Sequence, residues 1–128
     1  MVNSDDKLPN NNYVVEERRK FIRLNISVDV DYYVISNEQD KHPTHSVNIS
    51  TGGICIIAHE KLDVGTLLKL VITIPEIPPT VHATGRVAWV KSFTIATEEK
   101  TKYDVGIEFT EISEEDRKKV KRYVFSLR

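Results

Sequence analysis

The sequence predicts an all-β domain, a six-stranded antiparallel β-barrel followed by one C-terminal α-helix. Apolar and polar residues alternate over residues 24–34 and again over 81–90. Short turn-like segments separate six strand-like runs, and residues 113–127 instead repeat apolar residues at helical spacing. A period of two is typical of a half-buried strand, and a spacing of three and four is typical of an amphipathic helix. A closed barrel also removes the exposed edges that so many short strands would leave.

Length and composition indicate a single globular domain. The chain has 128 residues, of which 29% are charged and 40% hydrophobic, and its formal net charge is −1. A nearly neutral surface is a poor match for long duplex DNA, so recognition of phosphate would have to be local. No apolar run approaches the ~18 residues of a membrane-spanning helix, so no membrane insertion is expected.

The N-terminus and the cysteine content bear on the compartment. The first residues are acidic and polar, unlike the basic and then apolar pattern of a signal peptide. The single cysteine, Cys55, excludes an internal disulfide and fits a reducing compartment. We therefore expect a cytoplasmic protein.

In chain order, residues 1–12 are polar and are expected to form a disordered lead. Residues 13–23 follow as a basic arm, and 24–110 supply the barrel. A turn is expected at 36–41, and the proline-rich segment 75–79 cannot pair within a ladder. The six strands are expected at about residues 24–34, 45–49, 54–58, 66–74, 81–90 and 103–109.

Two of these strands carry further expectations. Residues 54–58 are apolar on both faces, which favours a central position in the sheet. In residues 81–90 the alternation places Trp89 on the apolar face with Val87. We favour a core position for Trp89; the alternative is a position close to a bound base.

The C-terminal segment has the signals of a helix at 113–127. Ser113 is a good N-cap, and Asp116 three residues later resembles a capping box. We expect the apolar stripe to pack on the sheet, with partner binding as the alternative. The stripe consists of Val120, Tyr123, Val124 and Leu127.

Two polar stretches are candidates for binding. Arg19 and Arg23 lie four residues apart in the basic arm, and guanidinium groups bind phosphates or a guanine edge bidentately. Asn48, Ser50 and Gly53 combine a planar amide, a hydroxyl and a residue without Cβ, which a flat ligand could approach closely. The simpler alternatives are a solvated cation cluster and an ordinary turn between strands.

Together these stretches resemble a known family. Arg19-x-x-x-Arg23 followed by Asn48-x-Ser50-x-x-Gly53 is similar to the two signatures of PilZ domains, which bind the bacterial second messenger cyclic di-GMP. Residues 85–90 and 103–109 also resemble later strands of such domains. The resemblance implies the same six-stranded barrel with a C-terminal helix.

The resemblance also implies roles for individual residues. Arg19 and Arg23 would contact phosphates and guanines, Asn48 and Ser50 would hold one guanine, and Gly53 would permit its close approach. Arg18, just before the arginine motif, favours a stacked pair of ligands. Asn48 stands where many members have Asp, and an amide oxygen accepts guanine N–H groups less strongly than a carboxylate.

The expected function is that of a cyclic di-GMP receptor or adaptor, with no other cofactor. Its N-terminal arm would change conformation on binding and signal to a partner protein. One alternative is a PilZ adaptor that binds no nucleotide, and another is a small barrel that binds single-stranded nucleic acid. The histidines show no metal-ligand spacing with Cys55, and no nucleophile motif is present. We therefore expect no catalytic or metal site and no enzyme.

Overall fold

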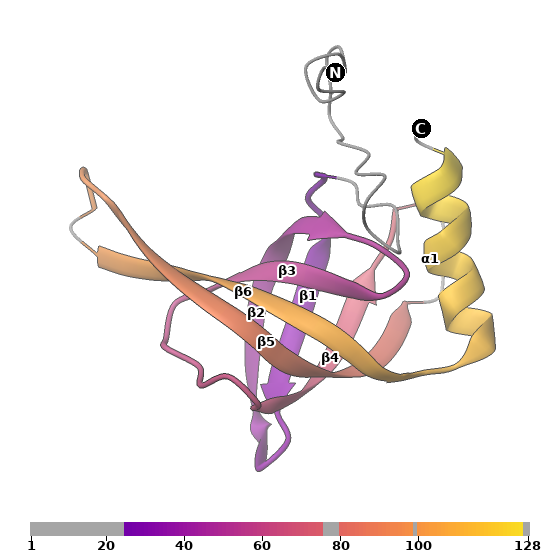
Figure 1. Cartoon of the computed structure of the whole chain (residues 1–128), viewed down its shortest axis with the longest axis horizontal. Helices are drawn as coiled ribbons and strands as arrows, with labels where there is room; N and C mark the ends of the chain where they lie inside the picture. The colour runs from indigo at the N-terminus through magenta and orange to yellow at the C-terminus, as the bar shows by residue number, and fades with distance from the viewer. Residues whose placement is uncertain (1–24, 76–79, 99, 127–128) are drawn as a thin grey trace, which may run out of the picture.

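The computed structural model describes residues 25–75, 80–98 and 100–126, which form a closed barrel with one helix outside it (Figure 1). The order around the barrel is β1-β2-β3-β6-β5-β4, and all neighbouring strands are antiparallel. The predicted fold class is therefore confirmed. The elements are β1 (Asp29–Val34), β2 (Asn37–Ile49), β3 (Gly53–Ala58), β4 (Leu67–Thr73), β5 (Val81–Ile95), β6 (Lys100–Ile112) and α1 (Glu114–Ser126).

The barrel is filled by aliphatic side chains that alternate with exposed residues. On β1, Val30 and Tyr32 are buried in the core, and Asp29 is exposed. On β4, Leu68 and Leu70 are fully buried on either side of the exposed Lys69. Burial of each such aliphatic side chain stabilises the fold by roughly 1.5–3 kcal/mol. The alternation in the sequence thus marks the inward face of these strands correctly.

Strand β3 is buried on both faces, as predicted. Ile54 and Ile56 belong to the barrel core, whereas Cys55 between them points to the outer face. Cys55 is nevertheless only 2% exposed, and its thiol is not in a disulfide. Every strand of the closed barrel has a neighbour on both sides, so the expected central position does not distinguish β3 from the other strands.

The predicted turn at 36–41 is wrong, because β2 begins eight residues before the expected start at 45. Val34 pairs with Asn37, so residues 35 and 36 alone make the turn. Residues 37–41 are exposed on both faces, so their composition lacks the alternation that marks a strand. Contacts along the surface support them instead, including an ion pair of 3.7 Å between Lys69 Nζ and Glu38 Oε1.

The core position predicted for Trp89 is also wrong. The pairing of β5 with β6 shifts between Val87 and Trp89, which is the sign of a β-bulge. An extra residue reverses the alternation, so Trp89 lies on the outer face and is 42% exposed. Beyond the bulge, β5 and β6 continue as a hairpin that projects from the barrel (Figure 1), which makes both strands longer than predicted.

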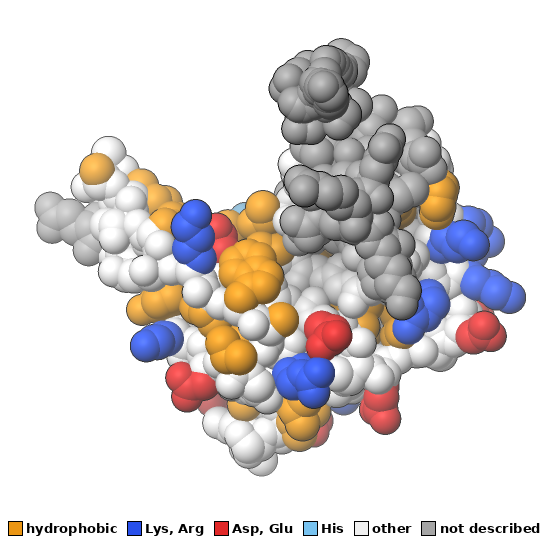
Figure 2. Space-filling model, viewed as in Figure 1, with side chains coloured by type: hydrophobic (Ala, Val, Ile, Leu, Met, Phe, Trp, Pro, Cys, Tyr) orange, Lys and Arg blue, Asp and Glu red, His pale blue; other side chains and the backbone are white. Residues whose placement is uncertain are grey.

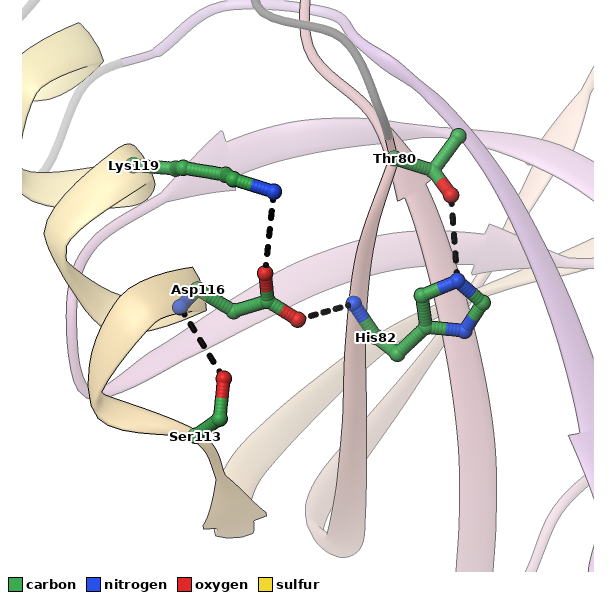
Figure 3. Close-up of polar contacts among 5 residues, drawn as sticks. All are labelled: Thr80, His82, Ser113, Asp116 and Lys119. Carbon is green, nitrogen blue, oxygen red and sulfur yellow. Dashed lines mark hydrogen bonds and ion pairs between the residues drawn. The ribbon is translucent and has the colours of Figure 1, made fainter.

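Helix α1 is capped by the hydroxyl of Ser113 and docked on β5 through the carboxylate of Asp116 (Figure 3). Ser113 Oγ accepts a hydrogen bond of 3.0 Å from the Asp116 amide, which confirms the predicted N-cap. The Asp116 carboxylate accepts a 3.1 Å bond from the His82 amide on β5 and lies 3.2 Å from Lys119 Nζ. The predicted stripe faces the barrel: Val120, Tyr123 and Val124 are buried, and Leu127 lies outside the described residues.

The described part of the chain contains neither a candidate membrane-spanning helix nor a candidate metal cluster. No helix in it combines the length and the apolar character needed to cross a membrane. Nor does any group of three or more His, Cys, Asp or Glu side chains there have an arrangement that could hold a metal ion.

Candidate functional site

The connection from β2 to β3, residues 50–53, is a tight turn held by its own serine. The Ser50 amide donates a 2.9 Å bond to the Gly53 carbonyl oxygen. Ser50 Oγ accepts bonds from the amides of Gly52 and Gly53, at 3.1 and 3.2 Å. Ser50 is only 6% exposed. Its hydroxyl therefore fixes the shape of the 50–53 turn from the inside.

Gly53 is required by the neighbouring strand. It pairs with Glu108 on β6, and a Cβ at Gly53 would collide with the carbonyl oxygen of Ile107. From the sequence, Gly53 is expected to permit the close approach of a ligand. The structure adds a reason that is independent of any ligand, since β3 and β6 could not keep this spacing with a larger residue.

Asn48 begins a row of residues that crosses four strands on the outer face. It pairs with Cys55, Cys55 pairs with Gly106, and Gly106 pairs with Trp89. Directly paired residues of antiparallel strands share a face of the sheet. The Trp89 indole lies against Gly106, where any Cβ would overlap it. The half-buried Asn48 and the exposed Trp89 are thus brought onto one surface next to the 50–53 turn.

A second row on the same face carries an ion pair. Gly53 pairs with Glu108, and Glu108 pairs with Arg86 on β5. Arg86 Nη2 lies 2.9 Å from Glu108 Oε1, and both side chains are about half exposed. Such an exposed pair contributes little to stability, about 0–1 kcal/mol. It does keep the Arg86 guanidinium near the turn.

Helix α1 contacts the turn directly. Arg117 Nη1 donates a 2.8 Å hydrogen bond to the Thr51 carbonyl oxygen. Sequence reasoning missed this residue, because a cation on a helix surface carries no signal of a carbonyl 66 positions earlier. The turn is thus held by β6 through Gly53 and by α1 through Arg117.

The predicted site residues divide into two groups. Asn48, Ser50 and Gly53 lie together at the end of β2 and in the 50–53 turn. The other three, Arg18, Arg19 and Arg23, lie outside the described residues.

The described surface suits a flat polar ligand. It offers an aromatic face, a planar amide and a guanidinium on the outer wall of the barrel. Charges of both signs are interspersed over the face seen in Figure 2, so the attraction for an anion would be local.

Comparison with known proteins gives a consistent result. The family model described as "PilZ domain" matches residues 17–126. No curated protein matches the sequence. The structure is similar to that of the Bacillus subtilis inhibitor of motility, MotI/DgrA, with 26% identity and a TM-score of 0.68. That match covers 86% of this chain and 51% of the other.

Two further solved structures share the fold at lower identity. One is the PilZ domain of Escherichia coli YcgR with c-di-GMP, with 16% identity, a TM-score of 0.65 and coverage of 86% and 91% of the two chains. The other is the K. pneumonia MrkH–c-di-GMP complex, with 20% identity, a TM-score of 0.69 and coverage of 89% and 52%. The chain thus spans about half the length of MotI/DgrA and MrkH.

Proposed function

The chain belongs to the PilZ domain family, and from this premise we propose that it is a cyclic di-GMP receptor that acts as an adaptor without catalysis. The observation that carries the proposal is the outer surface beside the 50–53 turn, where Asn48 and Trp89 share one row. Two structural neighbours, YcgR and MrkH, are named as complexes with this ligand. Their likeness supports the choice of ligand over other flat anions.

A guanine fits the chemistry of this surface. Its N1–H and N2–H₂ groups need acceptors and its O6 and N7 need donors, and the Asn48 amide carries both kinds of group. The exposed Trp89 indole offers a face on which a base can stack. Base stacking on an aromatic side chain contributes about 1–3 kcal/mol per base. Ser50 acts by shaping the turn, since its hydroxyl accepts two amide bonds within it.

The phosphates are assigned to the arginine motif. Arg19 and Arg23 would close over the ligand, with Arg18 favouring a stacked pair, and Arg86 adds a nearby cation. Each bidentate contact between an arginine and a guanine edge is worth about 1–3 kcal/mol. Micromolar affinity requires about 8 kcal/mol, which two such contacts and stacked bases can supply after the cost of ordering the arm. The ordered arm would present a new surface to a partner protein.

Calorimetric titration with cyclic di-GMP tests the proposal. We expect micromolar binding with two ligands per chain, and at least a tenfold loss of affinity in the Arg19→Ala, Arg23→Ala double variant. Lys20→Ala is the matched control, because it removes a cation of the same arm without a guanidinium. The fluorescence of Trp89, the single tryptophan of the chain, should change on binding.

The absence of both heat and a fluorescence change would contradict the proposal. Equal affinity in the double-arginine variant and in the wild type would also do so. Cyclic di-AMP is the control for specificity, since it keeps the phosphates and replaces both guanines. We expect it to bind at least tenfold more weakly.

A further inference from the structure

The outward face of α1 combines cations with one exposed aromatic ring. Phe125 is 45% exposed, and Lys118 and Arg122 precede it on the same side of the helix at spacings of seven and three residues. With Glu115 and Lys121 they line a hollow of about 400 Å³. Lys and Arg side chains gather over α1 in Figure 2. The face that α1 turns to the barrel is occupied by Val120 and Val124, so the ring of Phe125 belongs to a separate surface.

This face lies close to the proposed ligand site. Arg117 ties the first half of α1 to Thr51 in the 50–53 turn. Phe125 follows eight residues later, which corresponds to about 12 Å along the helix axis. Cations and ring are therefore within a short distance of the surface on which the arginine motif is proposed to close.

The chain just before the arginine motif has the complementary composition. Residues 13–17 read Tyr-Val-Val-Glu-Glu, three apolar residues followed by two acids. The proposed function puts residues 18–23 at the 50–53 turn. Those six residues span up to about 20 Å when extended, which exceeds the distance from the turn to Phe125 along α1. Residues 13–17 thus fall within reach of the cationic face.

We propose that residues 13–17 dock on the outward face of α1, with their apolar residues on Phe125 and their two glutamates on Lys118 and Arg122. The inference rests on the proposed function, which supplies the position of the arm. A docked segment would tie down the arm at its far end and reduce the entropy that ligand binding must overcome. The α1 face would then raise ligand affinity without touching the ligand.

Charge favours this occupant over a second copy of the chain. The outward side of α1 carries three cations and two acids, Lys118, Lys121 and Arg122 against Glu114 and Glu115. A symmetric contact between two such faces would bring like charges together. Residues 13–17 carry only negative charge. The segment also acts from the same chain, at a high effective concentration.

Paramagnetic broadening in the full chain tests the docking. A nitroxide label on Ser126→Cys lies next to Phe125, and Cys55, at 2% exposure, is shielded from the reagent. We expect the amides of residues 13–17 to broaden in the free protein and to sharpen again when Phe125→Glu is added. The same label on Lys100→Cys, in the projecting hairpin, is the control and should leave residues 13–17 sharp.

Ligand titration gives an independent readout. We expect Phe125→Glu to weaken cyclic di-GMP binding three- to tenfold with unchanged stoichiometry. Broadening in a chain that does not bind the nucleotide would refute the proposed function and leave the docking standing. Sharp amides, or broadening that persists in Phe125→Glu, would overturn the docking.

Two other partners could occupy the outward face of α1. Each would give a different experimental result, and either result would overturn the inference. Broadening that grows with protein concentration indicates a second copy on the α1 face. Sedimentation with vesicles of anionic phospholipid that depends on Phe125, together with sharp amides at residues 13–17, indicates a membrane surface.

Discussion

Arg117 Nη1 donates a 2.8 Å hydrogen bond to the carbonyl oxygen of Thr51, which joins α1 to the turn between β2 and β3. Thr51 lies between Ser50 and Gly52, whose hydroxyl and amide hold the turn together. A displacement of the turn by a ligand would therefore act directly on α1. This single contact links the proposed ligand surface to the only helix among the described residues.

Replacing Arg117 tests that link. A hydrogen bond from a charged donor is worth about 1.5–3 kcal/mol, and solvent exposure at this site reduces the value toward 1 kcal/mol. We expect Arg117→Ala to lower the free energy of unfolding by about 1 kcal/mol and to lower cyclic di-GMP affinity about fivefold in calorimetric titration. Lys100→Ala removes a cation far along the hairpin and should bind like the wild type. Equal affinities in both variants would show that the contact does not support the turn.

Gly53→Ala should destabilise the barrel. The added Cβ would collide with the Ile107 carbonyl oxygen, so β3 and β6 would have to separate. Forcing extra volume into a packed position costs typically about 1–3 kcal/mol. We expect a loss at the upper end of that range in urea unfolding. Thr51→Ala in the same turn keeps the carbonyl that Arg117 uses and should lose less than ~1 kcal/mol. A stable Gly53→Ala variant would contradict the strand spacing described here.

Replacing Asp116 should lower the stability of the fold mainly through its effect on Lys119, which is only 7% exposed. Its ammonium lies 3.2 Å from the Asp116 carboxylate, so Asp116→Ala leaves a nearly buried cation without this partner and the His82 amide without its acceptor. Breaking a buried ion pair costs up to about 3–5 kcal/mol. We expect a loss of ~2–3 kcal/mol, because the pair lies at the edge of the helix interface.

A double variant separates the two effects of this change. Asp116→Asn with Lys119→Met keeps an oxygen for the His82 amide and removes the buried charge. We expect it to recover at least half of the stability lost in Asp116→Ala, measured by urea unfolding. If the double variant recovers none of this stability, the loss in Asp116→Ala arises from the N-terminal turn of the helix and not from the buried charge of Lys119.

Tyr32 should make the fold sensitive to alkaline pH. Burial, and then the charge and hydrogen bond of the Glu60 carboxylate, raise the pKa of Tyr32 above its ordinary value. The folded pKa lies above the unfolded one, so the stabilisation is complete below the unfolded pKa of about 10 and is lost as pH rises toward the folded pKa. Once the unfolded tyrosine has ionised, the loss is about 1.4 kcal/mol per pH unit.

Comparison with Tyr32→Phe isolates this effect from other titrating groups. In urea unfolding between about pH 9 and pH 11, the free energy of unfolding of the wild type should fall relative to that of Tyr32→Phe. Tyrosine ionises in the unfolded state over this range, and phenylalanine cannot ionise. Phenylalanine also keeps the ring that stacks on His42 with centroids 4.7 Å apart. A constant difference between the two proteins over this range would contradict the raised pKa.

Periodicity predicted the barrel but not its irregularities. Strands such as β4, with Leu68, Leu70 and Ile72 inward, follow the alternation because one face meets the core and the other the solvent. The first part of β2 has solvent on both faces, and its polar residues read as a turn. The bulge before Trp89 moves that side chain outward. Its position depends on pairing with β6, which the sequence of β5 alone does not encode.

For the candidate site, the sequence predicts local geometry better than contacts between distant residues. A break between two strands was expected at residues 50–53, and the structure has a turn there, since turn chemistry is local. What each residue does there depends on distant partners. The glycine requirement comes from Ile107, and the tie to α1 comes from Arg117. These contacts follow from barrel closure and helix docking, which bring together residues far apart in the chain.

Each of the six strands is paired on both sides, β1 with β2 and β4 included. A slip of one residue in any strand would turn its aliphatic side chains out of the core. Sliding of one strand past another is therefore a poor route for a signal in this barrel. Under the proposed function, a change caused by the ligand would pass instead through parts attached to the wall, such as the basic arm, the 50–53 turn, the β5–β6 hairpin and α1.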